Sequence, residues 1–155
     1  MSKTVLSVGL EIVTGWALRW SGYDIVSGVE DLRSRRTESD GMPYLRFRRW
    51  LSGAKRLAGG NIDLVVYGSK VRATRVYYGF EAMLMAWCEH HGIPYRGMPG
   101  GLFKKHATGK YNASNVALMK AIRRRHILSP ATDSEAEALA LMYLVIDHEY
   151  DDLSN

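Results

Sequence analysis

Three carboxylates occupy positions where a divalent cation could be bound. Glu11 follows the first apolar run of the chain, and Asp133 and Glu137 lie four residues apart near the start of the last predicted helix. Side chains at this spacing share one face of a helix, and two like charges there repel each other unless a cation or a basic partner lies nearby. Because Mg²⁺ and Mn²⁺ prefer carboxylate oxygens, Glu11, Asp133 and Glu137 are candidate metal ligands and candidate catalytic residues.

Each of these carboxylates also has a structural interpretation. Glu11 could simply be solvated at the end of its strand. Thr132 and Glu135 have the spacing of a capping box, and acidic side chains in a first turn interact favourably with the helix dipole. This interpretation accounts fully for Glu135 and partly for Asp133, and it leaves Glu137 less explained.

Basic side chains are concentrated in one stretch of the second half of the chain. Between Lys104 and His126 there are seven Lys or Arg residues and no Asp or Glu. A field of one sign attracts polyanions such as nucleic acids. The alternatives are a solvated basic face and a dipole role for basic residues at a helix C-terminus. The candidate nucleic-acid-binding residues are Lys104, Lys105 and Lys110, in a predicted loop region, and Arg123, Arg124 and Arg125, at the end of a predicted helix.

A second candidate contact lies at the start of the helix predicted for 76–91. Arg72 and Arg75 precede Tyr77 and Tyr78 there. Aromatic side chains beside arginines can stack on unpaired bases, so Arg75 and Tyr77 are also candidates for nucleic-acid binding. Such residues equally occur in cores and on ordinary surfaces.

Length and composition favour one globular domain with its own core. The chain has 155 residues, 46% hydrophobic content and a formal net charge of +5. The charge is uneven, because residues 1–126 carry 21 basic against 9 acidic side chains. We expect neither a signal peptide nor a membrane span. The single cysteine, Cys88, excludes an intramolecular disulfide, suits a reducing cytosol and is predicted to pack inside a helix.

Apolar periodicity predicts an α/β fold. The alternation of strands and helices in the middle of the chain requires a mixed sheet with helices on its faces. Thr14 and Gly15 are predicted to form a turn between the first two strands, and residues 148–155 a flexible acidic tail. The predicted strands are 4–10, 16–20, 23–29, 62–67 and a short one that starts at 92–95. The predicted helices are 43–58, 76–91, 114–126 and one from about 133, with a turn or short helix at 102–107.

Four motifs follow one another at characteristic spacings. They are the first strand with Thr14-Gly15-Trp16-Ala17, the strand Ile62 to Tyr67, the basic stretch Lys104 to Lys110 followed by Asn112-Ala113-Ser114, and the acidic helix start Asp133 to Ala140. In this order they resemble the RuvC-like Holliday-junction resolvases of the ribonuclease-H-like superfamily, especially the compact phage-type members. The resemblance covers nearly the whole chain, to about residue 147.

This resemblance implies a ribonuclease-H-like fold, with a mixed five-stranded sheet and helices on both faces. It also implies phosphodiester cleavage by two Mg²⁺ or Mn²⁺ ions held by about four carboxylates. The matching positions here are Gly9, the surroundings of Gly68, and Glu137 with a neighbour among 133–135. Gly9 and Gly68 bring no carboxylate, and Glu137 is one methylene longer than the usual aspartate.

The same resemblance implies homodimers that bind branched DNA in the cytoplasm of a bacterial or phage-infected cell, with the helix 76–91 as a candidate interface. Three functions follow from these observations. The first is a binder of branched or structured DNA whose nuclease activity is lost or strongly impaired, with no cofactor required. The second is an active Mg²⁺-dependent junction-resolving endonuclease that uses substitute carboxylates. The third is a protein-interaction module that reuses the fold to bind a protein partner.

Overall fold

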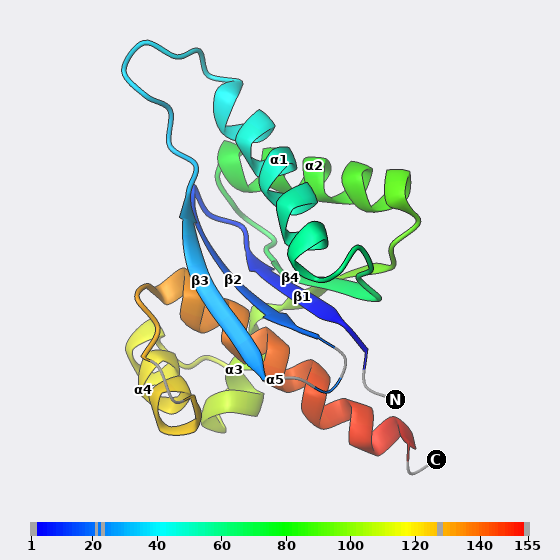
Figure 1. Ribbon diagram of the computed structural model, residues 1–155. Coiled ribbons are helices and arrows are strands. Elements are labelled where there is room, and N and C mark those ends of the chain that lie inside the picture. Colours follow the sequence, from blue (N-terminus) through cyan, green and yellow to red (C-terminus); the bar gives the residue numbers. More distant parts are fainter. Residues whose placement is uncertain (1–2, 21, 23, 127–128, 154–155) are drawn as a thin grey trace.

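Five strands form one mixed sheet (Figure 1). The computed structural model describes residues 3–20, 22, 24–126 and 129–153. The strands lie in the order β3-β2-β1-β4-β5, with an antiparallel meander of β1 to β3 and with β4 and β5 parallel to β1. The predicted α/β fold with a mixed five-stranded sheet is therefore confirmed. The strands are β1 (Val5–Gly9), β2 (Val13–Arg19), β3 (Ile25–Asp31), β4 (Leu64–Ser69) and β5 (Tyr95–Pro99).

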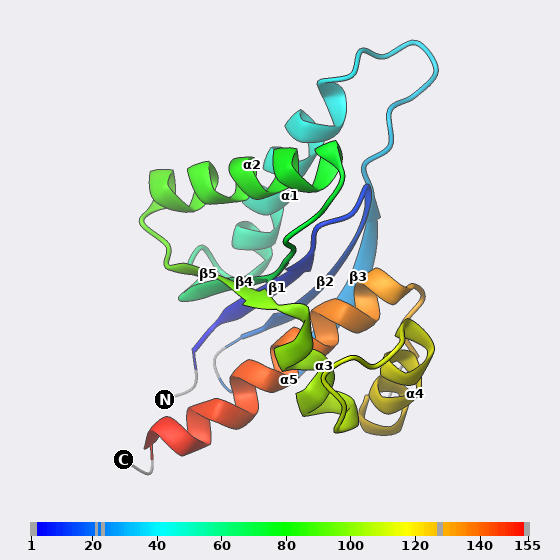
Figure 2. The ribbon, with the colours of Figure 1, turned by 180° about the vertical axis from the view of Figure 1, so that it is seen from behind.

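Helices cover both faces of this sheet (Figures 1 and 2). On one face lie α1 (Met42–Leu57) and α2 (Arg75–His91), and on the other lie α3 (Gly100–Thr108), α4 (Asn115–Arg125) and α5 (Asp133–Leu153). Successive side chains of a strand point to opposite faces. Leu6 and Val8 of β1 therefore belong to the core beneath α1 and α2, whereas Val5 belongs to the core beneath α5.

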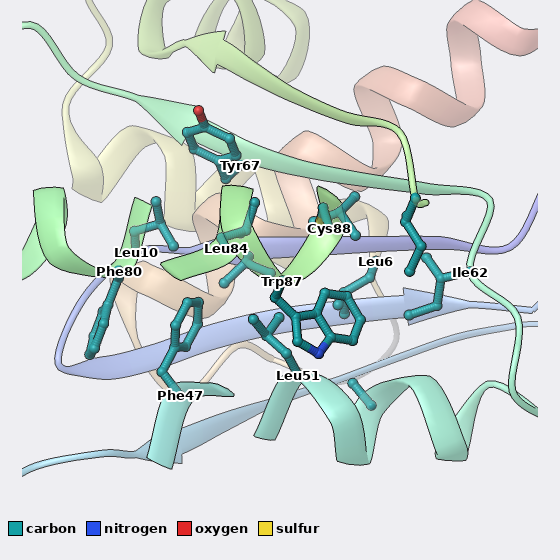
Figure 3. Packing of buried hydrophobic residues seen from close by; sticks show 14 of the residues in the cluster. Leu6, Leu10, Phe47, Leu51, Ile62, Tyr67, Phe80, Leu84, Trp87 and Cys88 are labelled. Atoms are coloured by element: carbon teal, nitrogen blue, oxygen red, sulfur yellow. The ribbon is translucent and has the colours of Figure 1, made fainter. Parts of the chain in front are cut away.

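The core under α1 and α2 is rich in aromatic residues (Figure 3). Phe47 of α1 stacks on Phe80 of α2 with ring centroids 4.6 Å apart. Trp87 packs in the same cluster, and its indole N–H donates to Ser52 Oγ at 3.0 Å. Cys88 is buried there as predicted, and burial raises the pKa of its thiol to about 12.

Short-range signals determine where the helices begin and end. The Ser114 hydroxyl caps α4 by accepting from the Ala117 N–H at 3.1 Å, and Thr74 caps α2 in the same way. Gly92 and Gly109 end α2 and α3 in the left-handed conformation, at φ 67° and 86°.

The predicted turn at Thr14 and Gly15 is wrong. Both residues lie inside β2, and the chain turns at residues 10–12. The Thr14 hydroxyl donates to the Glu11 carbonyl at 2.6 Å and so closes this turn, while Gly15 pairs with Gly9 across the sheet. Glycine is needed at position 15 for a different reason, the close approach of α5 that is described below.

Several boundaries also differ from the prediction, among them those of β4, which runs from Leu64 to Ser69 and not over 62–67. The alternative of a short helix at 102–107 is confirmed by α3, so Lys104 and Lys105 lie on a helix and not in a loop, and Phe103 beside them is buried in the core under α5. The third strand begins at Ile25, and Tyr23 lies outside the described residues. Helix α5 continues to Leu153, well into the predicted tail, and residues 154–155 lie outside the described part.

Within the described residues, none of the helices combines the length and the apolar character needed to cross a membrane.

Candidate functional site

The carboxyl group of Glu137 lies over two glycines, one from each of two neighbouring strands. Gly9 ends β1, and Gly68 follows Tyr67, the residue that pairs with Val8. A Cβ atom at Gly9 would lie 3.0 Å from Glu137 Oε2, and one at Gly68 would lie 3.0 Å from Glu137 Oε1. Glu137 therefore fills the space that side chains at positions 9 and 68 would otherwise occupy.

The first turn of α5 approaches this part of the sheet too closely for larger residues. A Cβ atom at Gly15 would lie 2.1 Å from the Glu135 backbone nitrogen, and one at Gly9 would lie 2.5 Å from Ser134 Oγ. Ser134 fixes the contact, because its hydroxyl accepts from the Gly15 N–H at 2.8 Å and donates to the Gly9 carbonyl at 3.3 Å. Gly9 and Gly15 thus form the surface of the sheet on which the first turn of α5 packs.

The Glu137 carboxylate lies in an unfavourable environment for its charge. Its Oε2 atom is buried and has no hydrogen-bond partner among the described residues. Burial raises the pKa of Glu137 to about 7, and the nearby charge of Glu11 acts in the same direction. Lys70 and Lys104 act in the opposite direction, so the site is one half-buried acid with a buried Oε2 atom and two lysines nearby.

The other two candidate ligands do not complete a metal site with Glu137, although Glu11 is close enough to raise its pKa. Strand β1 ends at Gly9, so Glu11 lies in the following bend with its side chain 51% exposed, 3.9 Å from Lys70 Nζ. Asp133 is exposed at the first position of α5. In the described part of the chain, no group of three or more His, Cys, Asp or Glu side chains could hold a metal ion. The residues present therefore do not fit the pair of Mg²⁺ ions that the resemblance implies.

Glu135 has the structural role that its spacing predicts. Its backbone N–H donates to Thr132 Oγ1 at 3.1 Å, as in a capping box. Its carboxylate accepts from the Ala131 N–H at 2.7 Å and from the Ser27 hydroxyl at 2.6 Å. These contacts attach the start of α5 to strand β3.

Tyr77 is buried and cannot stack on a base in this structure, which corrects its assignment as a nucleic-acid contact. Its side chain is only 2% exposed, because the ring packs in the core under α2. The hydroxyl donates to the Gly68 carbonyl at 3.1 Å and accepts from the Lys70 N–H at 3.0 Å. Tyr77 therefore holds the backbone beside Glu137, and its neighbours Arg75 and Tyr78 remain exposed.

The predicted basic residues gather on α3, on the turn after it and on α4. Lys104 is half-buried near Glu137, whereas Lys105 and Lys110 are exposed. Gly109 ends the helix and turns the chain between them. The structure thus places α3 and its lysines on the same side of the sheet as α5, with Lys104 close enough to Glu137 to lower its pKa.

The basic end of α4 is only partly available to a ligand. Arg125 donates two hydrogen bonds of 2.7 Å to Asp147 of α5, and its guanidinium lies 4.0 Å from the centre of the Tyr143 ring. Asp147 also lies 2.6 Å from His106 Nε2 of α3. The hydrogen bonds from Arg125 hold the pKa of Asp147 below its usual range. Arg125 therefore belongs to a network that joins three helices, whereas Arg123 and Arg124 are exposed.

Sequence reasoning missed two residues of this site. Ser134 stands between two acids, and a serine in a first helical turn gives no sign of a bond to a distant strand. Lys70 directly follows Gly68-Ser69, and only its place after a buried strand could have indicated a position beside the acid.

No protein-family model matches the sequence, and no curated protein matches it in sequence. Solved structures do match. RuvC of Thermus thermophilus aligns with a TM-score of 0.67 at 15% identity, over 88% of this chain and 89% of that one. The complex of T. thermophilus RuvC with a Holliday junction substrate gives a TM-score of 0.71 at 13% identity, over 89% of both chains. YeaZ from Pseudomonas aeruginosa gives 0.50 at 16% identity, over 73% of this chain and 51% of that one. At these identities the similarity establishes the fold: the chain has the ribonuclease-H-like fold of RuvC.

Proposed function

We propose that this protein binds branched or otherwise structured DNA and that its metal-dependent endonuclease activity is lost or strongly impaired. The observation that carries the second part is the position of Glu137, which fills the space above Gly9 and Gly68. Carboxylates at those two positions would be the main ligands of a metal pair, and here they are replaced by one buried acid. A surface that still carries lysines and arginines can bind DNA without cutting it.

Two observations support DNA as the ligand. The fold is that of RuvC, and the T. thermophilus protein has been solved with a Holliday junction substrate. In this chain, Lys105 on α3 and Lys110 just after it are exposed, and Arg75, Arg123 and Arg124 are exposed as well. Phosphate contacts of this kind position a protein on DNA but read little sequence, so recognition would depend on the shape of the junction. Two copies of the chain would match the two-fold symmetry of such a junction.

A binding assay tests the first part of the proposal. The probe is an immobile four-way junction, compared with a linear duplex of the same length and composition at several salt concentrations. We expect tighter binding to the junction and a steep loss of affinity with salt, because binding releases counterions from the phosphates.

The triple variant Lys104→Gln, Lys105→Gln, Lys110→Gln should bind more weakly, with a salt slope reduced by about 0.9 for each phosphate that the variant no longer neutralises. A matched control, Lys3→Gln, Lys55→Gln, Arg56→Gln, removes the same charge elsewhere. Equal effects of both variants would contradict this proposal.

A cleavage assay separates the binder from an active endonuclease. With Mg²⁺ or Mn²⁺ we expect little cleavage of the junction, and Glu137→Gln should keep or slightly improve the affinity for DNA. If Glu11, Asp133 and Glu137 instead acted as substitute ligands, the protein would nick the junction symmetrically and Glu137→Gln would abolish the nicking. Symmetric cleavage at the rate of an ordinary resolvase would refute the loss of activity.

A further inference from the structure

A second basic site lies at the start of the long connection between β3 and α1. An open hollow of about 520 Å³ is lined there by three arginines, one serine and one aspartate. They are Arg33, Arg35, Arg46, Ser34 and Asp31. None of these arginines belongs to the basic stretch 104–126, and the site lies on another segment of the fold.

Ion pairs give this connection a defined shape. Arg33 donates to both oxygens of Asp31, at 2.9 Å and 2.6 Å. Glu38 accepts from the Arg35 N–H at 2.6 Å and pairs with the Arg46 guanidinium, which also donates to the Arg33 carbonyl at 3.3 Å. The guanidinium of Arg46 is therefore fixed at the edge of the hollow before any ligand arrives, which lowers the entropic cost of binding.

The segment keeps an excess of positive charge after these pairs are formed. Residues 31–49 contain six arginines and three carboxylates. The Arg33 hydrogen bonds lower the pKa of Asp31 to about 2, and those of Arg46 lower the pKa of Glu38, so both acids stay ionised and stay paired. The Arg35 side chain is exposed, and it makes no hydrogen bond or ion pair with the described residues.

The hollow lies at the same end of the sheet as Glu137. Asp31 pairs with Val13 at the start of β2, and the Leu32 N–H donates to the Ile12 carbonyl at 3.0 Å, next to the turn that follows Gly9. In Figure 1 the connection rises from this corner, at the end of β3 and above the start of α5. The hollow and Glu137 therefore lie at the same end of the sheet, where one extended ligand can contact both.

We propose that this hollow binds a phosphate group of the DNA backbone. The planar guanidinium of arginine matches the oxygens of a phosphate, and Ser34 adds a hydroxyl donor. Exposed Arg36, Arg48 and Arg49 flank the hollow along the chain, and such an open strip suits a polymer with repeated phosphates better than a single small anion. The inference rests on the proposed function for the source of the phosphate, and it adds a contact that holds a second part of the DNA, beyond the one at α3.

The test compares Arg35→Gln with Arg56→Gln, which removes one exposed charge at the opposite end of α1. With the four-way junction as probe, Arg35→Gln should weaken binding several-fold and reduce the salt slope by about 0.9, whereas Arg56→Gln should leave the slope unchanged. Separately, titration of the wild-type protein with inorganic phosphate should shift the NMR signals of the Arg33, Arg35 and Arg46 side chains, and Arg35→Gln should weaken this effect.

The outcomes distinguish this inference from the proposed function. If the wild-type protein binds the junction and both variants behave alike, the inference is wrong while the proposed function stands. If the wild-type protein binds no DNA, the proposed function fails. Phosphate shifts would in that case show that the hollow takes free phosphate rather than DNA, which overturns its assignment to the DNA backbone.

Discussion

A single methylene group separates Glu137 from the aspartate that the RuvC-like resemblance places at its position. The longer side chain reaches the sheet between β1 and β4, where Gly9 and Gly68 leave room for its carboxyl group. The burial of an acid without a hydrogen-bond partner for one oxygen is costly when the acid is charged. The raised pKa of Glu137, about 7, expresses this cost.

Glu137→Gln should therefore change the pH dependence of stability. The pKa of Glu137 in the folded protein, about 7, lies above the ordinary value of 4.5. The native state then holds a proton that the unfolded state loses, so this contribution to stability is complete below pH 4.5 and is lost as the pH rises toward 7 and above. Glutamine stays neutral throughout. As the pH rises from 5 to 8, the free energy of unfolding of the variant should therefore increase by up to ~3 kcal/mol relative to that of the wild-type protein.

Urea unfolding at these two pH values measures the difference, with Glu89→Gln, at an exposed position on α2, as the control. A difference between Glu137→Gln and the wild-type protein that does not change with pH would show that Glu137 is freely solvated.

At the scale of elements, the close packing of α5 on the sheet determines the geometry of the site. The Ser7 hydroxyl donates to the Ala138 carbonyl at 2.6 Å, and Ser134 bonds to both Gly9 and Gly15. These bonds attach the first two turns of α5 to β1 and β2. The close contact requires glycine at position 15, since any Cβ there would meet the helix backbone.

The exchange of single glycines for alanine tests this packing. Gly15→Ala should destabilise the protein by about 2–3 kcal/mol, because the added methyl group forces α5 away from the sheet. Gly53 lies inside α1, where a Cβ atom would have no contact closer than 3.7 Å. Gly53→Ala should therefore stabilise the protein by up to ~1 kcal/mol through helix propensity. Thermal unfolding of both variants measures these opposite effects. If Gly15→Ala left the stability unchanged, α5 would not pack on the sheet as closely as described.

The same elements show what the sequence could predict. The helices and most strands were predictable because their signals are local: apolar periodicity in α1 and α2, and the hydroxyl cap of Ser114. Gly15 was misread, because a glycine that forms a turn and one that lets a helix approach look alike in a sequence. Tyr77 was misread for a similar reason, since only the tertiary fold decides whether a tyrosine beside an arginine faces solvent or Gly68.

The candidate site was predictable only in part. The resemblance located Gly9, Gly68 and Glu137, and the lack of two carboxylates was visible in the sequence. That Glu137 lies over both glycines depends on the packing of α5 against β1 and β4, elements more than sixty residues away in the chain. No local pattern records such a contact.

The whole molecule separates its charges by segment. Residues 127–155 carry seven carboxylates and no Lys or Arg, and Asp147 among them binds Arg125 and His106. The acidic helix α5 thus holds the basic helices α3 and α4 on its own surface and leaves Lys105, Lys110, Arg123 and Arg124 in solvent. A single copy has this basic surface on one side of α5, so a two-fold junction would need a second copy.

The exposed face of α2 is where we expect that second copy to bind. Tyr78 is 45% exposed, and Ala82 and Ala86 follow it at intervals of four residues, both exposed, so the three form one apolar face of the helix. Two such faces related by a two-fold axis could pack closely, since alanines permit close approach of the helices.

Light scattering should give twice the 17.5 kDa mass of the chain. The double variant Ala82→Glu, Ala86→Glu should be monomeric, because four like charges would meet in the interface. It should also bind the four-way junction at least ~10-fold more weakly, because a monomer cannot bind the junction at two sites. Leu57→Glu, at a 53% exposed residue that ends α1, is the control and should remain dimeric. A monomeric wild-type protein, or a double variant that stays dimeric, would show that this face of α2 is not the interface between two copies.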